Sequence, residues 1–328
     1  MLTPFSISLV PKSLKNRIAG VILILLSLLV SSNSYIQPGH TKSKAAIQHK
    51  NEPKPRMFLI TVIDSYDDTI GRRCETDMED ILFAFEELSD WLDVKMENPK
   101  IISGDKFSKA GVNDAIDNWL RSQRPTKIDI VVFYYSGHGF RYPGDASEYP
   151  RMWLKTNTDR NTSTTNLRME QDIYDRIIKM GAGVNIVLSD CCNTSVVGET
   201  AAFDEINVPI RKRVSHKKPE EDDSTDDIDN ADRLFIPPHP LSILATAAGR
   251  DEFAGGKTET GGFFTNYLLD ALDQCIFESK LDPTWQSIFE YVDENAGYWA
   301  RSAPCPTAKH NEQGRCVQMV KFKVEDGD

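Results

Sequence analysis

The spacing of hydrophobic positions along the chain follows two patterns, one typical of buried strands and the other of helices. Short apolar runs rich in β-branched residues predict strands over 57–64, 128–135, 184–189 and 242–247. The second run, IDIVVFYY, does not alternate with polar residues. Both of its faces should therefore be buried, as they are in a parallel sheet.

Longer segments between these runs place apolar residues at every third or fourth position, which predicts amphipathic helices. The predicted helices cover residues 77–92, 112–120, 167–180, 263–275 and 285–299. Weaker strand patterns occur at 94–102 and 316–324. Because strands alternate with helices, the chain predicts an α/β sandwich with a mostly parallel central sheet.

The first 34 residues have the pattern of a targeting segment rather than of a folded domain. Residues 1–18 contain three basic residues and no acidic one, 19–30 are an apolar run, and 31–34 are small and polar. This order predicts a secretory signal peptide. An uncleaved signal anchor is the alternative, although the run is short for a bilayer span of about 20 residues. We expect a polar linker over 35–55 and a protein that is exported, or anchored to a membrane only through this segment.

The composition, 40% hydrophobic and 27% charged over 328 residues, provides enough apolar side chains for one large or two small domains. The net charge of −11 argues against a general nucleic-acid binder, which needs clustered Lys and Arg. Eight carboxylates and no basic residue fall within 219–232. We expect that stretch to be solvated, as part of a charged loop over 198–240.

Two polar clusters directly follow predicted buried strands, Ser136–Gly139 (SGHG) and Asp190–Asn193 (DCCN). The carboxyl ends of parallel strands lie at one edge of a sheet, so the clusters are expected to meet. There His138 can take the proton of Cys192 and later protonate a leaving amine. Backbone N–H groups near Gly139 and Cys192 can bind an oxyanion. A single buried Cys or His is usually a core residue, so the prediction depends on the pair.

The remaining cysteines and histidines carry no comparable pattern. No C-x-x-C pair occurs among the six cysteines, so no structural zinc site is expected. Cys305 and Cys316 could close a small loop in an exported protein. The other five histidines, His216 among them, fall in predicted loops and are expected to be solvated. The sequence predicts neither a metal site nor a cofactor.

The two clusters and their surroundings resemble the caspase-like cysteine peptidases, particularly metacaspases and their bacterial relatives. FYYSGHGF (133–140) and LSDCCN (188–193) are similar to the family's His and Cys motifs, in the same order. IGRRCETDMEDI (70–81) looks like the loop and helix after the family's first strand, and 242–272 like the start of its second half. The resemblance covers residues 56–323 and implies one peptidase domain with a caspase-like three-layer sandwich.

The resemblance also implies roles for individual residues. His138 matches the general acid/base, Cys192 the nucleophile, and Gly139 and Cys192 the backbone donors to the oxyanion. Asp190 matches the acidic residue that makes metacaspase pockets prefer Arg or Lys at the substrate's P1 position, and Ser136 matches another residue lining that pocket. The implied function is a cysteine endopeptidase that cleaves peptide or protein substrates after Arg or Lys.

Two further positions bear on the P1 preference. Asp64 ends the first predicted strand and is expected to contribute to the substrate pocket. Arg73 falls near the position where true caspases place an Arg that holds a substrate Asp. It either forms a surface pair with Arg72 or pairs with Asp190 and neutralises the pocket. The latter arrangement leaves an acidic P1 preference as an alternative.

Departures from the family pattern concern calcium and processing. The acid-rich loop linked to calcium in many metacaspases is represented here only by Asp145 and Glu148, so calcium dependence is not supported. The segment 198–240 carries basic residues, and self-cleavage there is the alternative to a tolerated insertion.

Other functions remain as alternatives. The domain could be a catalytically silent caspase-like scaffold, or a legumain- or gingipain-like peptidase with the same dyad. An unrelated α/β binding domain would require His138 and Cys192 to lie far apart. Within the DCCN cluster, the D-x-C register selects Cys192 as the nucleophile and directs Cys191 into the core.

Overall fold

The computed structural model describes residues 53–154, 164–195, 215–216, 225–303, 305 and 313–327. The predicted signal segment and most of the predicted linker lie outside the described residues, as does much of the charged loop over 198–240. Among the described residues, no helix is both long and apolar enough to cross a bilayer.

A mostly parallel sheet forms the centre of the fold. The strand order is β12-β9-β8-β4-β1-β2, and β3 also pairs with β1. The pairings between the described strands of this sheet are parallel, except that of β12 with β9. The strands are β1 (Arg56–Ile63), β2 (Lys95–Met96), β3 (Lys100–Ile102), β4 (Ile130–Ser136), β8 (Val184–Asp190), β9 (Leu241–Thr246) and β12 (Lys321–Asp326).

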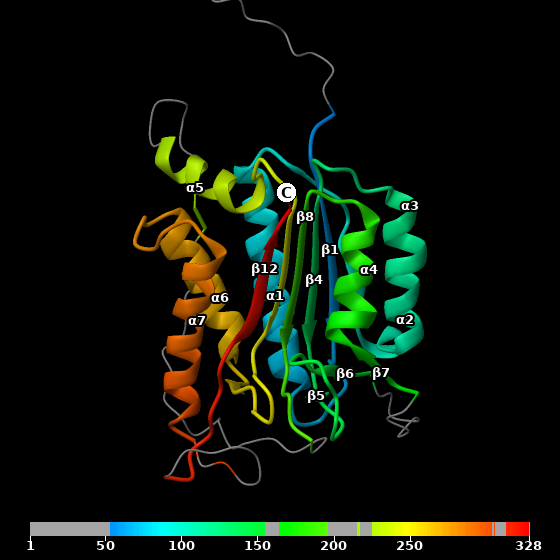
Figure 1. Cartoon of the computed structure of the whole chain (residues 1–328), viewed down its shortest axis with the longest axis vertical. Coiled ribbons are helices and arrows are strands. Elements are labelled where there is room, and N and C mark those ends of the chain that lie inside the picture. The colour runs from blue at the N-terminus through cyan, green and yellow to red at the C-terminus, as the bar shows by residue number, and fades with distance from the viewer. Residues whose placement is uncertain are drawn as a thin grey trace, which may run out of the picture. The chain divides into compact units, whose positions relative to one another are not determined.

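Helices cover both faces of this sheet, so the described part of the domain is a three-layer sandwich (Figure 1). One face carries α1 (Gly71–Trp91), α5 (Thr225–Phe235), α6 (Phe263–Ile276) and α7 (Trp285–Ala300). The other carries α2 (Lys109–Asp114), the π-helical Ala115–Leu120, α3 (Arg121–Gln123), the π-helical Met169–Tyr174, α4 (Asp175–Ile177) and the 3-10 turn Ile178–Met180. The predicted fold class is confirmed.

Short elements surround the carboxyl ends of the strands. They are a 3-10 turn (Gly104–Lys106), the three-stranded sheet β5 (Gly139–Phe140), β6 (Arg151–Trp153) and β7 (Asn166–Arg168), and the hairpin β10 (Gly256–Lys257) and β11 (Gly261–Gly262). The small sheet and the hairpin were not predicted, because strands of two or three residues leave no periodic pattern.

The central strands form because their apolar side chains are buried on both faces. Every residue of β4 and of β8 is buried. Side chains that alternate along β8 divide between two apolar clusters, with Ile186 on the α1 and α6 side and Val187 on the other. Full burial of such a side chain contributes about 1.5–3 kcal/mol. The sheet is therefore fixed at its centre, and its carboxyl ends are held in register.

Three local predictions are wrong. Helix α1 begins at Gly71, before the predicted residue 77, and β12 occupies only the end of the predicted strand 316–324 and runs on to Asp326. Part of the acidic stretch 219–232 is not a solvated loop, since it lies in α5. Ala231, Leu234 and Phe235 are buried there because they share one helical face.

Candidate active site

The strand register brings the predicted site residues to one edge of the sheet. Ser136 at the end of β4 pairs with Ile63 at the end of β1 and with Asp190 at the end of β8. The residues that follow these three strands therefore leave the sheet at the same level. Asp64 remains attached there, since its N–H donates to the carbonyl of Ser136 at 3.0 Å.

Cys192 lies two residues beyond the end of β8 and is partly exposed. The N–H of Ala254 donates to its sulfur at 3.3 Å. Burial raises the pKa of the thiol, while the contact with Ala254 and the charge of Arg73 act in the opposite direction. Cys191, by contrast, is 1% exposed and belongs to the apolar cluster on the other face. The two neighbouring sulfurs thus differ in access, as the D-x-C register predicts.

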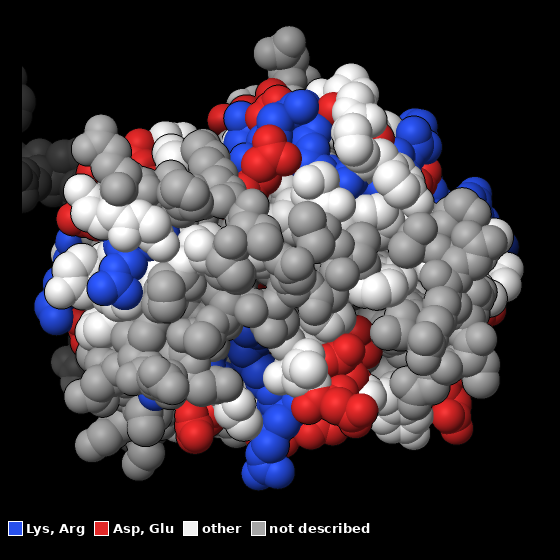
Figure 2. Space-filling view, turned by 90° about the horizontal axis from the view of Figure 1, so that it is seen from below, with Lys and Arg blue, Asp and Glu red and all other residues white. Residues whose placement is uncertain are grey.

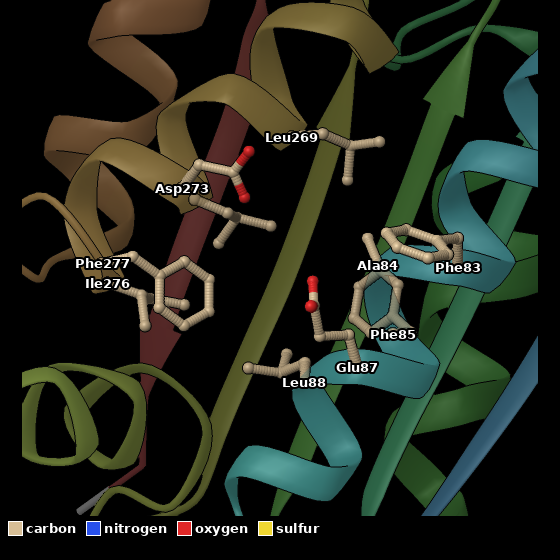
Figure 3. Close-up of a pocket in the computed structure, with 10 residues that line it drawn as sticks. Phe83, Ala84, Phe85, Glu87, Leu88, Leu269, Asp273, Ile276 and Phe277 are labelled. Carbon is tan, nitrogen blue, oxygen red and sulfur yellow. The ribbon is translucent and has the colours of Figure 1, made fainter. Parts of the chain in front are cut away.

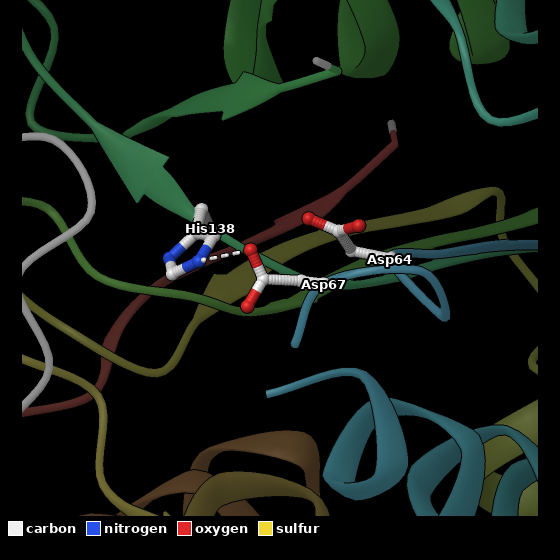
Figure 4. A group of neighbouring side chains, drawn as sticks. All are labelled: Asp64, Asp67 and His138. Carbon is white, nitrogen blue, oxygen red and sulfur yellow. Dashed lines mark hydrogen bonds and ion pairs between the residues drawn. The ribbon is translucent and has the colours of Figure 1, made fainter. Parts of the chain in front are cut away.

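His138 lies in the loop between β4 and β5 and is mostly buried. Its Nε2 is 3.2 Å from a carboxylate oxygen of Asp67 (Figure 4). Its ring centroid lies 5.8 Å from that of Trp153. The hydrogen bond with His138 lowers the pKa of Asp67 far below its usual range, against the effect of burial. Among the described residues, the imidazole of His138 hydrogen-bonds to Asp67, and the thiol of Cys192 hydrogen-bonds to the backbone of Ala254. The imidazole and the thiol are not hydrogen-bonded to each other.

Gly139 brings the two loops into direct contact. A Cβ added to Gly139 would lie 2.1 Å from the carbonyl oxygen of Cys192 and 2.6 Å from the sulfur of Cys191. Glycine is therefore required for the loop after His138 to pass so close to the loop after β8. This contact makes His138 and Cys192 neighbours on adjoining loops, and it excludes the alternative in which they lie far apart.

A buried cluster of charged and polar side chains lies beside Cys192 and includes two residues predicted to line the substrate pocket. Asp190 accepts hydrogen bonds from the backbone N–H (3.0 Å) and hydroxyl (2.8 Å) of Thr265. Ser136 donates to the carboxylate of Asp77 at 2.7 Å, and Gly262 donates its N–H to the other oxygen of Asp77 at 2.7 Å. Asp190, Ser136 and Asp77 are each at most 3% exposed. Asp190 and Ser136 were predicted, whereas Asp77 was missed.

Arg73 completes this cluster and is not part of an exposed pair with Arg72. Its side chain packs against the β10–β11 hairpin, where a Cβ on Gly256 would lie 2.6 Å from Cδ of Arg73. Cβ atoms on Gly261 and Gly262 would lie 2.2 Å from Asp77 and 2.0 Å from Asp190. The three glycines therefore make room for one arginine and two carboxylates under the same hairpin.

The charged groups of this cluster shift one another's pKa values. Burial and then the charge of Asp190 raise the pKa of Asp77 well above its usual value. Burial also raises the pKa of Asp190, against the charge of Arg73. Burial disfavours the cation of Arg73, but Cys74, Asp190 and Asp77 together raise its pKa. One permanent cation faces two carboxyl groups, so the cluster retains either a net negative charge or a bound proton.

Asp64 faces His138 rather than this cluster. The ligand atoms of Asp64, Asp67 and His138 all lie within 4.8 Å of one another (Figure 4). These three residues are the set that could hold a cation among the described residues. The two acidic residues of the segment after the SGHG cluster each pair with an arginine, since Asp145 lies 2.8 Å from Arg151 and Glu148 lies 3.4 Å from Arg250. The pairing with Arg151 lowers the pKa of Asp145 to about 2.

An apolar hollow lies between α1 and α6, away from the reactive residues (Figure 3). Its lining residues are Phe83, Ala84, Phe85, Glu87, Leu88, Leu269, Leu272, Asp273, Ile276 and Phe277. At its edge the ring of His216 stacks on Phe277 at 3.8 Å, and Trp91 donates to the carbonyl of His216 at 3.1 Å. The prediction of a solvated His216 is therefore wrong. This hollow holds no nucleophile.

The face at the carboxyl ends of the strands carries charges of both signs. In the described part of that face, Lys and Arg side chains are interspersed with Asp and Glu (Figure 2). The buried charged groups that act on the thiol of Cys192 are Arg73 and Asp190.

An α/β sandwich with a cysteine and a histidine on adjoining loops, at the carboxyl edge of its parallel sheet, has the arrangement of a cysteine hydrolase. The sequence specifies the class further. The chain belongs to the caspase-domain peptidase family, whose model matches residues 56–313. Members of this family are cysteine peptidases.

Two caspases are among the solved structures that are similar to the chain. The Drosophila initiator caspase Dronc is 9% identical with a TM-score of 0.39, over 82% of this chain and 78% of that one. Caspase-1 from Spodoptera frugiperda is 10% identical with a TM-score of 0.45, over 83% of this chain and 87% of that one. No curated protein matches the chain.

Two site residues escaped the sequence analysis, and both contact residues far away in the chain. Asp67 meets His138 71 positions later, and Asp77 meets Gly262 185 positions later. A weak signal existed for Asp77, because it lies four residues after Arg73. In a helix that spacing puts both side chains on one face.

Proposed function

We propose that the protein is a cysteine endopeptidase in which Cys192 attacks the scissile carbonyl and His138 transfers protons. The observation that carries this proposal is the contact of the two loops at Gly139, whose absent Cβ lets the loop after His138 approach the carbonyl of Cys192. Because burial disfavours the thiolate of Cys192, proton removal by a nearby imidazole is needed for attack at neutral pH.

The catalytic cycle follows from these positions. His138 takes the thiol proton or delivers a proton to the leaving amine, and Cys192 forms a thioester that water hydrolyses. Backbone N–H groups at Gly139 and Cys192 stabilise the oxyanion, and loss of one such donor typically costs about 2.7–4 kcal/mol of transition-state stabilisation. The carboxylate of Asp67 keeps the imidazole oriented until substrate enters.

The pocket supports cleavage after Arg or Lys. Arg73 compensates one of the two carboxyl groups, Asp77 and Asp190, and a P1 cation supplies the second positive charge. A carboxylate that receives a guanidinium or ammonium group forms a charge-assisted hydrogen bond, which rejects uncharged side chains. An acidic P1 side chain would add a third carboxylate to a pocket with one arginine, so this preference is disfavoured.

The test is a peptide-library cleavage profile of the purified protein beside Cys192→Ala and Cys191→Ala, with and without calcium. We expect Cys192→Ala to abolish cleavage after Arg and Lys, and Cys191→Ala to retain most of it. A thiol-reactive peptide ketone carrying Arg should label Cys192 alone. An intact Cys192→Ala activity would overturn the assignment, and absence of selective labelling would favour the silent scaffold.

A further inference from the structure

Two cysteines from a late segment of the chain, Cys305 and Cys316, lie beside the proposed nucleophile Cys192. Cys305 and Cys316 belong to a small buried cluster that includes Phe253 and Phe263, and Cys192 packs against the same cluster. The thiols of Cys305 and Cys316 are hydrogen-bonded to each other. The backbone also holds this pair in place, because the N–H of Cys316 donates to the carbonyl of Ala303 at 3.0 Å.

The three sulfurs differ in access to solvent. Cys316 is fully buried, Cys305 is 9% exposed, and Cys192 is partly exposed at the site. A soluble oxidant therefore reaches Cys192 first. Burial raises the pKa of both Cys192 and Cys316, but at Cys192 the N–H of Ala254 and the charge of Arg73 oppose that effect, whereas Cys305 adds to it at Cys316. Cys192 thus combines access to peroxide with groups that favour its thiolate, the form that peroxide oxidises.

The remaining cysteines are placed elsewhere. Cys191 faces the opposite side of the sheet, and Cys275 contacts the carbonyl of Asp282 at the end of α6. Cys74 is fully buried in α1. Cys74 and Cys275 belong to the large apolar cluster on the same side of the sheet as Cys192, whereas Cys305 and Cys316 belong to the small cluster that Cys192 also packs against and lie there as a pair.

We propose that Cys305 and Cys316 form a resolving pair that returns an oxidised Cys192 to its thiol. Hydrogen peroxide converts the Cys192 thiol to a sulfenic acid and releases water. The thiol of Cys305 attacks that sulfur, forming a Cys192–Cys305 disulfide and releasing a second water. The thiol of Cys316 then attacks Cys305, leaving a Cys305–Cys316 disulfide and a free Cys192 thiol. Overall, one peroxide is reduced and two thiols are oxidised.

This pair gives an exported peptidase a specific protection. Oxidation of Cys192 beyond the sulfenic acid is irreversible in the absence of a dedicated repair enzyme, so a nearby thiol that intervenes at the first step preserves activity. The resulting Cys305–Cys316 disulfide lies behind the nucleophile and leaves its sulfur free. The inference uses the proposed function only in treating Cys192 as the reactive thiol.

The experiment treats the reduced full-length protein with an equimolar amount of hydrogen peroxide, then alkylates free thiols and maps disulfides by mass spectrometry. The wild type should form Cys305–Cys316 and retain activity. Cys316→Ser should stop at the Cys192–Cys305 disulfide, with activity lost until a dithiol is added. Cys305→Ser should leave Cys192 as the sulfenic acid, which a second equivalent of peroxide converts to the sulfinic acid with irreversible loss of activity. Cys275→Ser is the matched control and should behave as the wild type.

Cys192→Ala separates this inference from the proposed function. If oxidation enters through Cys192, the Cys305–Cys316 disulfide should form in this variant at least about tenfold more slowly, since the buried thiols must react directly. Formation at the wild-type rate overturns the relay, as does a Cys316→Ser protein without any Cys192–Cys305 bond. These outcomes are read from the masses of the disulfide-linked peptides and not from peptidase activity. Peptide cleavage by reduced Cys192→Ala would instead overturn the proposed function and leave the disulfide map readable.

Discussion

The most informative perturbation is Asp77→Asn, because it changes the charge of the pocket and leaves its shape. Asparagine can still accept the N–H of Gly262 through its carbonyl oxygen and donate to the hydroxyl of Ser136. In the variant, the one remaining carboxylate, Asp190, is neutralised by Arg73. A P1 arginine therefore no longer finds a carboxylate without a positive partner. Selectivity for a charged P1 side chain should therefore decrease.

The magnitude follows from the contact that is lost. A hydrogen bond to a charged group contributes about 1.5–3 kcal/mol, which corresponds to about 10- to 150-fold in kcat/KM. The assay compares matched peptides with Arg or its uncharged isostere citrulline at P1. The Arg/citrulline ratio should decrease by that factor in Asp77→Asn, and it should be unchanged in the control Glu75→Gln, which lies exposed on the same helix.

Stability provides a second readout with a definite sign. The pKa of Asp77 is raised in the folded state, so its contribution to stability is fully present below the usual Asp pKa and is lost as pH rises through the raised value. Asp77→Asn should therefore be more stable than the wild type at neutral pH and equal to it in acid. A variant that cleaves Arg and citrulline peptides with the wild-type ratio, or that is destabilised at neutral pH, refutes the charge argument.

Three further changes test the scaffold of the site. Gly139→Ala should abolish activity and lower Tm, because its Cβ would meet the Cys192 carbonyl at 2.1 Å, and a wild-type kcat/KM would contradict that contact. Asp67→Asn should be less stable than the wild type above the usual Asp pKa and equally stable in strong acid, because the folded-state pKa of Asp67 is depressed. If the stability of the two proteins changed with pH in parallel, the hydrogen bond with His138 would not be the cause of that depression. Phe85→Ala should cost about 3–5 kcal/mol in denaturant unfolding, and a cost under 1 kcal/mol would contradict its burial.

The sequence predicts the sheet well because strands buried on both faces leave continuous apolar runs. The strands at 57–64, 128–135, 184–189 and 242–247 are confirmed to within two residues. The β10–β11 hairpin could not be predicted, since its glycines carry no periodic signal and are placed by the charged side chains below them. Helix α5 was missed because acidic composition outweighed its short apolar face.

The residues of the candidate site likewise divide into those that the sequence could predict and those that it could not. Ser136, His138, Asp190 and Cys192 could be selected because each lies at or just after the end of a predicted strand. The location of Arg73 in the pocket could not be predicted, because a surface pair with Arg72 satisfies the local pattern equally well. Its burial depends on the glycine hairpin that packs over it, which is a contact between segments about 180 residues apart.

The alternation of side chains along β8 determines which sulfur serves the site. Ile186 and Leu188 face the α1 and α6 side, so Asp190 and then Cys192 continue on that side, where Thr265 and Ala254 contact them. Cys191 is turned to the opposite cluster. A slip of one residue would exchange all of these faces and bury Asp190 among apolar side chains without its partners. The packing that stabilises β8 therefore also places Asp190 and the thiol of Cys192 on the same side of the sheet. A change in the register of β8 would move both side chains together.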